Sequence, residues 1–430
     1  MKTATLEAPL PRTTPAGTAA PAGCCRFCAA PLSRTFVDLG TSPLCQDHVR
    51  PQDYNRAEPT YPLHAYVCES CWLVQVGEFV EASNVFRDDY AYFSSFSPSW
   101  LRHAARYVEA VTERLGLGPQ HRVVEVASND GYLLQYFVAK GIPVLGIEPA
   151  ANVAAAARAL NVPTLGKFFG AATAEEVRRG HGPADLIIGN NVLAHVPDLN
   201  DFVRGLGLLL APTGVVTLEF PHLLRLVAGR QFDTIYHEHF SYFSFWTVER
   251  VLARHGLTIF DVEELSTHGG SLRLFARHAA HAGLAVTPAV AALREREVTA
   301  GICTPAYYAD FAEQVREAKR GLLEFLITAR RAGKTVVGYG APGKGNTLLN
   351  YCGIGTDFLD YTVDLSPHKQ GNFLPGSRIP ILHPDAIFET QPDYVLILPW
   401  NLRDEIADQM AGIRAWGGRF VVPIPEVEVF

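Results

Sequence analysis

The sequence predicts an α/β protein in which a cysteine-rich N-terminal module precedes two Rossmann-like sheets. A strand–turn–helix–strand pattern covers residues 123–148, and a second strand–glycine turn–helix pattern covers residues 335–351. Six of the eight cysteines lie before residue 72. We expect a disordered tail, a metal-binding module, a central nucleotide-binding domain and a smaller C-terminal α/β domain, over residues 1–22, 23–88, 89–284 and 285–430.

Composition limits the classes of partner. The chain has 430 residues, enough for two or three domains, with 48% hydrophobic residues and a formal net charge of -7. It has no basic stripe and no apolar run approaching ~18 residues, so neither a nucleic acid nor a membrane is expected. Residues 1–22 are rich in Ala, Pro and Thr and lack the apolar stretch of a signal peptide. We expect a cytoplasmic monomer or weak homo-oligomer that binds a small molecule.

Two C-x-x-C pairs predict a structural metal site. Cys25 and Cys28 form the first pair, and Cys68 and Cys71 form the second. Without a secretory signal, two such pairs favour one Zn²⁺ held by four thiolates, with no open position for water. Cys24 or Cys45 can substitute for a ligand, and reduced or disulfide-bonded cysteines are the alternative.

The β-α-β pattern begins with a buried strand at residues 123–126 and a turn at residues 128–131. Apolar residues then recur at helical spacing to residue 138, and a second apolar run at residues 144–147 ends at Glu148. An acid about 20 residues beyond the turn can hold two ribose hydroxyls. The segment therefore predicts a nucleotide site.

The turn chemistry favours S-adenosylmethionine. A dinucleotide turn carries G-x-G-x-x-G, whereas this turn has a single glycine beside Asp130, which would repel a phosphate. S-adenosylmethionine has no phosphate and carries a sulfonium and an ammonium, which suit the carboxylates of Glu125 and Asp130. The alternative is an ordinary β-α-β unit with a solvent-facing acidic loop.

Further polar residues are expected at the rim of the same sheet. A third buried strand covers residues 185–190, and another covers residues 215–220. Because the carboxyl ends of parallel strands face the ligand crevice, Asn190, Asn191 and His195 should lie there. A lone histidine in such a place can equally be structural. The segment 88–95, with Tyr90 and Tyr92, suggests either a loop over a polar ligand or a linker packed between domains.

The densest chemistry is Tyr236-His237-Glu238-His239. An imidazole that titrates near neutrality can remove a proton while the carboxylate holds its tautomer or charge. A structural polar network or a second metal are the alternatives, although H-E-H lacks the spacing of H-E-x-x-H. Further on, H-G-G-S-L-R at 268–273 reads as a tight turn into a strand.

The C-terminal third predicts a helix over residues 307–331, with Phe311, Val315, Ala318, Leu322 and Phe325 on one face, and then a second sheet. Its turn, Gly338-x-Gly340-x-x-Gly343, satisfies a dinucleotide fingerprint, with Asp364 at the position of a ribose-binding acid. It also matches most of a P-loop, but Gly345 replaces the Ser/Thr that binds Mg²⁺, so a working NTPase is not expected.

Together these motifs resemble those of the nucleotide-sugar C-methyltransferases, which methylate 4-keto-deoxysugars with S-adenosylmethionine. The resemblance covers essentially everything after the tail. Its motifs are the C-x-x-C pairs, D-Y-A-Y-F-S-S, E-V-A-S-N-D-G-Y-L-L, N-N-V-L-A-H-V-P, Y-H-E-H-F-S-Y-F-S, H-G-G-S-L-R and G-Y-G-A-P-G-K-G-N-T-L-L-N. It implies a class I methyltransferase sheet. One departure is Ala127, where the family turn usually has glycine.

The resemblance also implies roles for individual residues. Tyr236, Glu238 and His239 would form the active site, with His239 the general base, and Tyr90 and His195 would contact the sugar or its 4-keto oxygen. The resemblance supports a nucleotide-sugar role for the C-terminal domain but does not assign its lysines individually. From the turn chemistry we expect the glycine-turn amides, with Lys344 and Lys369, to receive the sugar-nucleotide diphosphate, unless this domain only buttresses the active site. Tyr92 and Asn346 are further substrate candidates. The expected cofactor-binding residues are Glu125, Ala127, Asn129, Asp130, Gly131, Glu148, Asn190 and Asn191.

The expected function is C-methylation, at C3, of a dTDP-4-keto-deoxysugar through an enolate, for a branched sugar of an antibiotic or similar metabolite. Methylation at C5 is the first alternative, because both carbons beside a 4-ketone are activated. The others are an NAD-dependent sugar-nucleotide oxidoreductase and a zinc-dependent interaction module with an inactive methyltransferase fold.

Overall fold

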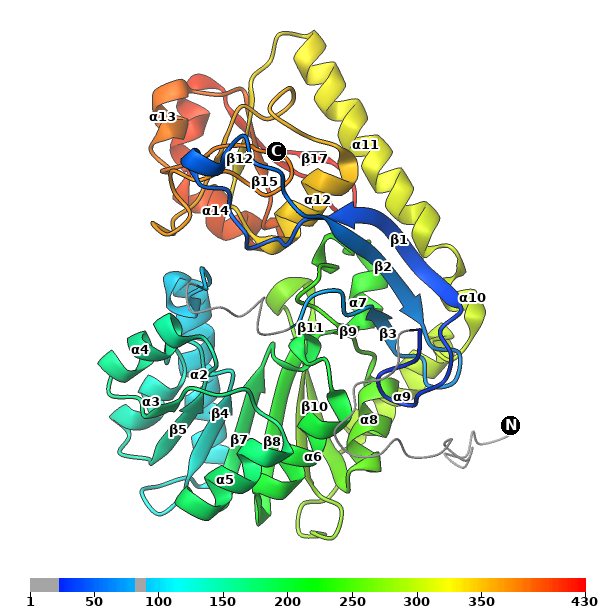
Figure 1. Ribbon diagram of the computed structural model, residues 1–430, viewed down its shortest axis with the longest axis vertical. Helices are drawn as coiled ribbons and strands as arrows, with labels where there is room; N and C mark the ends of the chain where they lie inside the picture. Colours follow the sequence, from blue (N-terminus) through cyan, green and yellow to red (C-terminus); the bar gives the residue numbers. More distant parts are fainter. Residues whose placement is uncertain (1–22, 82–89) are drawn as a thin grey trace.

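The computed structural model describes residues 23–81 and 90–430 and contains three sheets (Figure 1). The expected disordered tail at residues 1–22 and the first part of the predicted loop, Asp88 and Asp89, lie outside the described residues. A four-stranded antiparallel sheet lies beside the long helix α11, between a seven-stranded central sheet and a six-stranded C-terminal sheet. No helix in the described ranges is long and apolar enough to cross a membrane.

The antiparallel sheet joins segments that are far apart in the sequence. Its strands, in spatial order, are β1 (Arg34–Ser42), β2 (Tyr61–Val67), β3 (Val74–Val76) and β9 (Ser241–Tyr242). Strand β9 directly follows the Tyr236–His239 segment, so that segment bridges two modules. The buried face of the sheet packs against α11, where the rings of Phe36 and Phe311 stack with centroids 4.3 Å apart.

The central sheet has the strand order of a class I methyltransferase, which confirms the predicted fold class. The spatial order is β10-β11-β8-β7-β4-β5-β6, and β11 is antiparallel to both of its neighbours. The predicted strands at 123–126, 144–147, 185–190 and 215–220 are all present. The strands are β4 (Val123–Val126), β5 (Val144–Ile147), β6 (Thr164–Leu165), β7 (Ala184–Asn190), β8 (Leu210–Pro221), β10 (Leu257–Leu265) and β11 (Ser271–His278).

Helices cover this sheet through apolar stripes. Helix α2 (Pro98–Leu115) begins at the N-cap Ser97, whose hydroxyl accepts from the Trp100 amide, and ends at Gly116 in the left-handed conformation. Its buried residues recur three or four apart, as a surface helix requires. The other helices of this domain are α3 (Leu134–Ala139), α4 (Ala151–Ala159), α5 (Ala171–His181), α6 (Leu199–Leu209), α7 (Leu223–Ala228) and α8 (Phe245–Arg254).

The C-terminal sheet has the strand order of a complete doubly wound fold. Its order is β14-β13-β12-β15-β16-β17, parallel except for the last pair. The strands are β12 (Val336–Tyr339), β13 (Thr362–Val363), β14 (Ile381–Leu382), β15 (Tyr394–Ile397), β16 (Arg419–Val422) and β17 (Glu428–Val429). The helices after the central sheet are α9 (Pro288–Ala300), α10 (Pro305–Ala309), α11 (Phe311–Arg331), α12 (Gly343–Cys352), α13 (Ala386–Thr390) and α14 (Arg403–Gln409).

One detail of the predicted 307–331 helix was wrong, because the helix is divided at Asp310 into α10 and α11. Of the five residues predicted to share an apolar face, four are buried, and Phe325 is partly buried against the same core. Leu326 extends this face toward the end of the helix.

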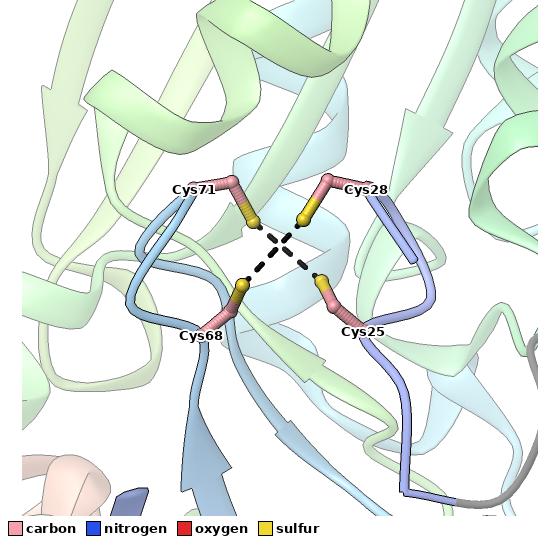
Figure 2. A group of neighbouring side chains, drawn as sticks. All are labelled: Cys25, Cys28, Cys68 and Cys71. Atoms are coloured by element: carbon pink, nitrogen blue, oxygen red, sulfur yellow. Dashed lines mark hydrogen bonds between the residues drawn. The ribbon is translucent and has the colours of Figure 1, made fainter. Parts of the chain in front are cut away.

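The four predicted zinc ligands form one cluster (Figure 2). The sulfur atoms of Cys25 and Cys71, and those of Cys28 and Cys68, are 3.5 Å apart, and all four lie within 4.8 Å of one another. Bonds of about 2.3 Å to a tetrahedral Zn²⁺ would set the sulfurs about 3.8 Å apart, whereas a disulfide requires about 2.05 Å. The cluster therefore fits a four-thiolate zinc site, and Cys24 and Cys45 do not belong to it.

The zinc module is attached to the central domain by hydrogen bonds. The Arg26 guanidinium donates to the Pro197 carbonyl at 3.0 Å, and the Asn200 amide donates to the Arg26 and Phe27 carbonyls at 3.1 and 3.0 Å. The Thr247 hydroxyl donates to the Cys71 carbonyl at 3.1 Å. Since Pro197 follows the His195 loop, the position of this loop depends on the folded zinc module.

Cys28→Ser should release zinc and destabilise the protein, whereas Cys24→Ser should do neither. Loss of a metal ligand belongs to the class of changes that cost more than about 4 kcal/mol, so the first unfolding midpoint should fall by at least about 5 °C. Metal content by mass spectrometry and calorimetry test this. Zinc retained at one per chain in Cys28→Ser would contradict the four-cysteine assignment.

Candidate active site

A cavity of about 800 Å³ lies where the three modules meet. The 90–100 loop, the carboxyl ends of β4, β5 and β7, the 234–239 segment, and the turns after β12, β13 and β15 all contribute to its wall. The carboxyl edges of both Rossmann-like sheets thus open into the same space. This arrangement suits a reaction between two ligands, one held by each sheet.

The turn after β4 adopts the backbone of a cofactor-binding turn despite its missing glycines. Ala127, Asn129 and Gly131 have φ values of 55°, 49° and 80°, all in the left-handed region. A side chain in that region costs on the order of 1–2 kcal/mol, and such strain is typical of functional sites. At Gly131 a Cβ atom would approach Ala157 of α4 to 3.3 Å, so glycine allows α4 to pack closely.

Glu148 lies at the predicted ribose position. Its Oε2 accepts from the Asn129 amide at 3.1 Å and its Oε1 from the Ala150 amide at 2.9 Å. Burial raises the pKa of Glu148 to about 7, although both backbone bonds oppose the shift. Each carboxylate oxygen keeps a second lone pair for a hydroxyl donor. Of the expected cofactor-binding residues, those that line the cavity are Ala127, Asn129, Glu148, Asn190 and Asn191.

Glu125, Asp130 and Gly131 are not part of the cavity lining. Glu125 is 1% exposed, and neither of its carboxylate oxygens has a hydrogen-bond partner of good geometry in the described part of the chain. Burial raises the pKa of Glu125 well above its usual value, in spite of the nearby Tyr132 phenol. Glu125 therefore lies behind the cavity wall, beside the Tyr132 phenol, and does not reach the cavity surface.

The 92–95 segment is fixed over the turn. The Ser94 amide donates to Asn129 Oδ1 at 2.8 Å, and the Ser95 amide donates to Asp130 Oδ2 at 3.0 Å. Next to it, the Phe93 ring stacks on His368 of the C-terminal domain with centroids 5.1 Å apart. The segment therefore covers the cofactor turn and also packs between domains, so the two interpretations of this loop are compatible.

His239 is held in one tautomer. Its Nδ1 lies 2.9 Å from the Thr234 carbonyl and its Nε2 lies 2.8 Å from the Tyr236 hydroxyl. Because a carbonyl only accepts, Nδ1 carries the proton, and Nε2 accepts from the phenol. Burial, with the neighbouring His195, lowers the pKa of His239 well below its usual value. The imidazole is thus neutral at pH 7, with its basic nitrogen paired to Tyr236.

The prediction that the Glu238 carboxylate holds this tautomer was wrong, because the Thr234 carbonyl does so. Glu238 instead accepts from the Tyr90 hydroxyl at 3.2 Å and from the Cys45 thiol at 3.3 Å. Burial raises the pKa of Glu238 to about 7. Glu238 and His239 are neighbours in the sequence, but Glu238 is oriented by Tyr90 and Cys45, whereas His239 is oriented within its own segment.

Further histidines complete the centre. The His195 ring lies 4.6 Å from the His239 ring at 79°, and burial lowers the pKa of His195 to about 4. His268, which the sequence indicated only as part of a turn, lines the cavity and pairs with the Asn191 amide at 3.0 Å. Asn191 and His268 both have positive φ, 55° and 53°. A histidine beside a glycine pair at the start of a strand was the available signal for His268.

On the opposite wall the predicted lysines differ. The Lys344 ammonium donates to Asn401 Oδ1 at 2.8 Å and lies 5.0 Å from the centre of the Trp400 ring. Burial lowers the pKa of Lys344, and the charge of the nearby Asp233 carboxylate opposes this shift. Lys369 donates to the Ala341 carbonyl at 3.0 Å and to Asp364 at 3.3 Å.

The remaining substrate candidates also separate. Tyr92 lines the cavity and is 42% exposed, whereas Asn346 is 1% exposed and is not part of the lining. The Asp364 carboxylate accepts from the Ala341 and Ser366 amides at 2.8 and 2.9 Å as well as from Lys369. Three internal donors thus occupy the acid that a dinucleotide fingerprint would assign to a ribose.

Three family models match successive parts of the chain. They are a putative zinc binding domain over residues 25–86, a methyltransferase domain over residues 100–262 and a C-methyltransferase C-terminal domain over residues 266–425. The first and third correspond to the cysteine cluster and to the region that carries Lys344.

A curated relative and several solved structures are similar to this chain. C-methyltransferase NovU from Streptomyces niveus is 39% identical over 405 residues, which cover 94% of this chain and 96% of the relative. Magnesium protoporphyrin IX methyltransferase of Synechocystis PCC 6803 with bound SAM is 14% identical, covering 47% of this chain and 99% of that chain, with a TM-score of 0.34. A SAM-dependent methyltransferase from Anabaena variabilis is 15% identical, covering 41% and 84%, with a TM-score of 0.33.

NovU and the three family models show the family to which this chain belongs. The 39% identity extends over 405 residues, which is 94% of this chain. This chain belongs to the S-adenosylmethionine-dependent C-methyltransferase family whose members carry an N-terminal zinc-binding domain.

Proposed function

We propose that the protein methylates C3 of a dTDP-linked 4-keto-deoxysugar through an enolate, in the biosynthesis of a branched deoxysugar for an antibiotic or related metabolite. The carrying observation is the Tyr236–His239 pair, a phenol donating to the basic nitrogen of a neutral imidazole on the cavity wall. A carbon beside a ketone is acidic enough for such a base. The same carbon, once deprotonated, is a nucleophile for a methyl group.

The geometry supports a simple sequence of proton movements. When a ketone oxygen approaches, the Tyr236 O–H turns from His239 Nε2 to that oxygen, and the lone pair on Nε2 becomes available. His239 then removes the proton from C3, and the electron pair of the C–H bond forms the enolate, whose oxygen accepts from Tyr236. S-adenosylmethionine, when bound, supplies an electrophilic methyl group on its sulfonium. The enolate carbon would take up that methyl group while the electron pair of the broken S–CH3 bond leaves on S-adenosylhomocysteine, and His239 would release its proton to solvent.

Preorganised donors give this arrangement its catalytic value. The pair lies in a cavity where burial keeps the neighbouring His195 neutral, with its pKa lowered to about 4. In such a low-dielectric site, one hydrogen bond to a developing oxyanion contributes about 3–4 kcal/mol. Neutral histidines can donate to the sugar or its 4-keto oxygen without adding a charge that would disfavour the cationic cofactor.

Lys344 supports the nucleotide part of the proposal. Its side chain lies at the first turn of α12, beside Asn401 and Trp400, and it feels the charge of the buried Asp233 carboxylate without a direct hydrogen bond to it. A diphosphate would meet both this ammonium and the amides of the helix N-terminus. The occupied Asp364 carboxylate speaks against the alternative of an NAD-dependent oxidoreductase.

The direct test incubates the protein with S-adenosylmethionine and a dTDP-4-keto-2,6-dideoxyhexose, with mass spectrometry and NMR of the product. We expect the gain of one methyl group at C3. His239→Asn should lower the rate by about 10²–10⁴-fold because the general base is lost, while the exposed control His181→Asn should not change it. Methylation at C5 would overturn the regiochemistry, and a wild-type rate in His239→Asn would overturn the base assignment.

Affinity for S-adenosylmethionine should depend on the ionisation of Glu148. Its raised pKa of about 7 leaves the carboxyl protonated at lower pH, and the ionised form accepts better from ribose hydroxyls. Between pH 6 and 8 the ionised fraction, and with it the affinity, should rise about tenfold. Glu148→Gln should abolish this rise of affinity with pH and weaken S-adenosylmethionine binding by about 10-fold or more. The control Glu175→Gln, on the exposed face of α5, should change neither. Isothermal titration calorimetry across this pH range measures both effects, and wild-type behaviour of Glu148→Gln would refute the ribose assignment.

The two lysines should respond differently to replacement. Lys344→Met should raise the dissociation constant of dTDP by about 10–100-fold, through loss of a charge-assisted bond, with little change in the unfolding midpoint. Lys369→Met should instead destabilise the domain by about 3–5 kcal/mol, because Asp364 loses its buried partner. Calorimetry of binding and of unfolding separates these outcomes. Unchanged dTDP binding in Lys344→Met would contradict the diphosphate assignment.

A further inference from the structure

One cysteine of the N-terminal module is not a zinc ligand and yet reaches the catalytic segment. Cys45 is 3% exposed, and its thiol donates to Glu238 Oε1 at 3.3 Å. The next residue, Gln46, lines the cavity, and its buried Oε1 has no partner among the described residues. The stretch that follows β1 is therefore part of the active-site wall, and this thiol is its contact with the Glu238 carboxylate.

The C-terminal domain fixes the same thiol from the other side. A Cβ atom at Gly343, the first residue of α12, would lie 2.9 Å from Cys45 Sγ and 3.5 Å from Tyr236 Cζ. A contact of 2.9 Å is shorter than real Cβ atoms show, so the sulfur occupies space that only a glycine leaves free. The three modules therefore meet at Cys45, and the packing gives its S–H little freedom.

The Glu238 carboxylate is held at both oxygens. Tyr90 donates to Oε2 at 3.2 Å, and Cys45 donates to Oε1. Burial, reinforced by the Glu238 charge, raises the pKa of the Cys45 thiol well above 9, so the sulfur stays protonated and remains a donor. Asp47 and Lys369 also face Glu238, with opposite effects on its charge.

We infer that Cys45 is a positioning residue: its S–H fixes the orientation of the Glu238 carboxylate in the cavity and stabilises its ionised form, linking the zinc module to catalysis. Replacement of this thiol removes one of two donors to a buried carboxylate. Loss of that donor disfavours the anion, so Glu238 would ionise at higher pH. The kinetic consequence rests on the proposed function, whereas the hydrogen bond itself does not.

Infrared spectroscopy of the zinc-loaded protein tests the hydrogen bond directly. Outside the zinc cluster the chain has four thiols, Cys24, Cys45, Cys303 and Cys352. The S–H stretching band assigned to Cys45, by difference from Cys45→Ser, should lie below that of Cys352. It should move to higher frequency in Glu238→Gln, while the Cys352 band stays in place. A Cys45 band that Glu238→Gln does not move would overturn the inference.

The pH dependence of turnover tests the functional consequence. In Cys45→Ala the acid-side limb of kcat should move up by about one pH unit, with KM for S-adenosylmethionine unchanged. Cys45→Ser keeps a hydrogen-bond donor, so its acid-side limb should shift less than that of Cys45→Ala. Cys352→Ala removes another buried thiol and should not move the limb. Coincident profiles for wild type and Cys45→Ala, or an equal shift in Cys352→Ala, would overturn the positioning role.

These two readouts distinguish the inference from the proposed function. If the sugar substrate is wrong, the wild-type protein fails to methylate it as well, and the infrared comparison still reports on the Cys45–Glu238 contact. If only the inference is wrong, the wild-type protein methylates the sugar, and Cys45→Ala has the same pH profile of kcat as the wild type.

Discussion

The hydrogen bond from His239 Nδ1 to the Thr234 carbonyl is the constraint on which the active site depends. It fixes which imidazole nitrogen is basic and directs that nitrogen at Tyr236. The bond is local, since five residues separate its partners, but the segment that contains it is not supported locally. The segment leaves the central domain, adds β9 to the N-terminal sheet and contacts α12 through Thr347, whose hydroxyl donates to the Ile235 carbonyl at 3.1 Å. All three modules must therefore be folded for the base to be in place.

This architecture explains how a structural metal contributes to chemistry that it does not touch. The zinc cluster holds the turns on which Arg26 and Cys71 contact the central domain, next to the His195 loop and α8. The second cysteine pair lies between β2 and β3 of the antiparallel sheet. The first strand of the same sheet, β1, leads into the stretch that contains Cys45. In the cavity, burial then keeps the histidines neutral and raises the pKa of Glu148 and Glu238 to about 7. The low dielectric around such buried side chains strengthens the hydrogen bonds between them.

Much of the fold, and part of the site, followed from local sequence patterns. Ligand spacing identified the zinc cysteines, and period and turn residues identified β4, β5, β7 and β8, because such signals act over a few residues. Contacts over long separations did not follow. Sequence proximity suggested that Glu238 orients His239, but a backbone carbonyl does so, and Glu238 is oriented by Cys45, 193 residues away. The contact that distinguishes Lys369 from Lys344 is local, because Asp364 lies five residues before Lys369, but its proximity in the sequence was not interpreted as an ion pair.

Solvent-deuterium exchange without a methyl donor tests the central claim most directly. The wild-type protein would be incubated in deuterium oxide with a dTDP-4-keto-2,6-dideoxyhexose and S-adenosylhomocysteine, which fills the cofactor site but transfers nothing. If the cavity generates an enolate toward C3, NMR should show deuterium entering C3 faster than in the protein-free control. Exchange at the spontaneous rate, or faster exchange only at C5, would contradict base-catalysed enolate formation at C3.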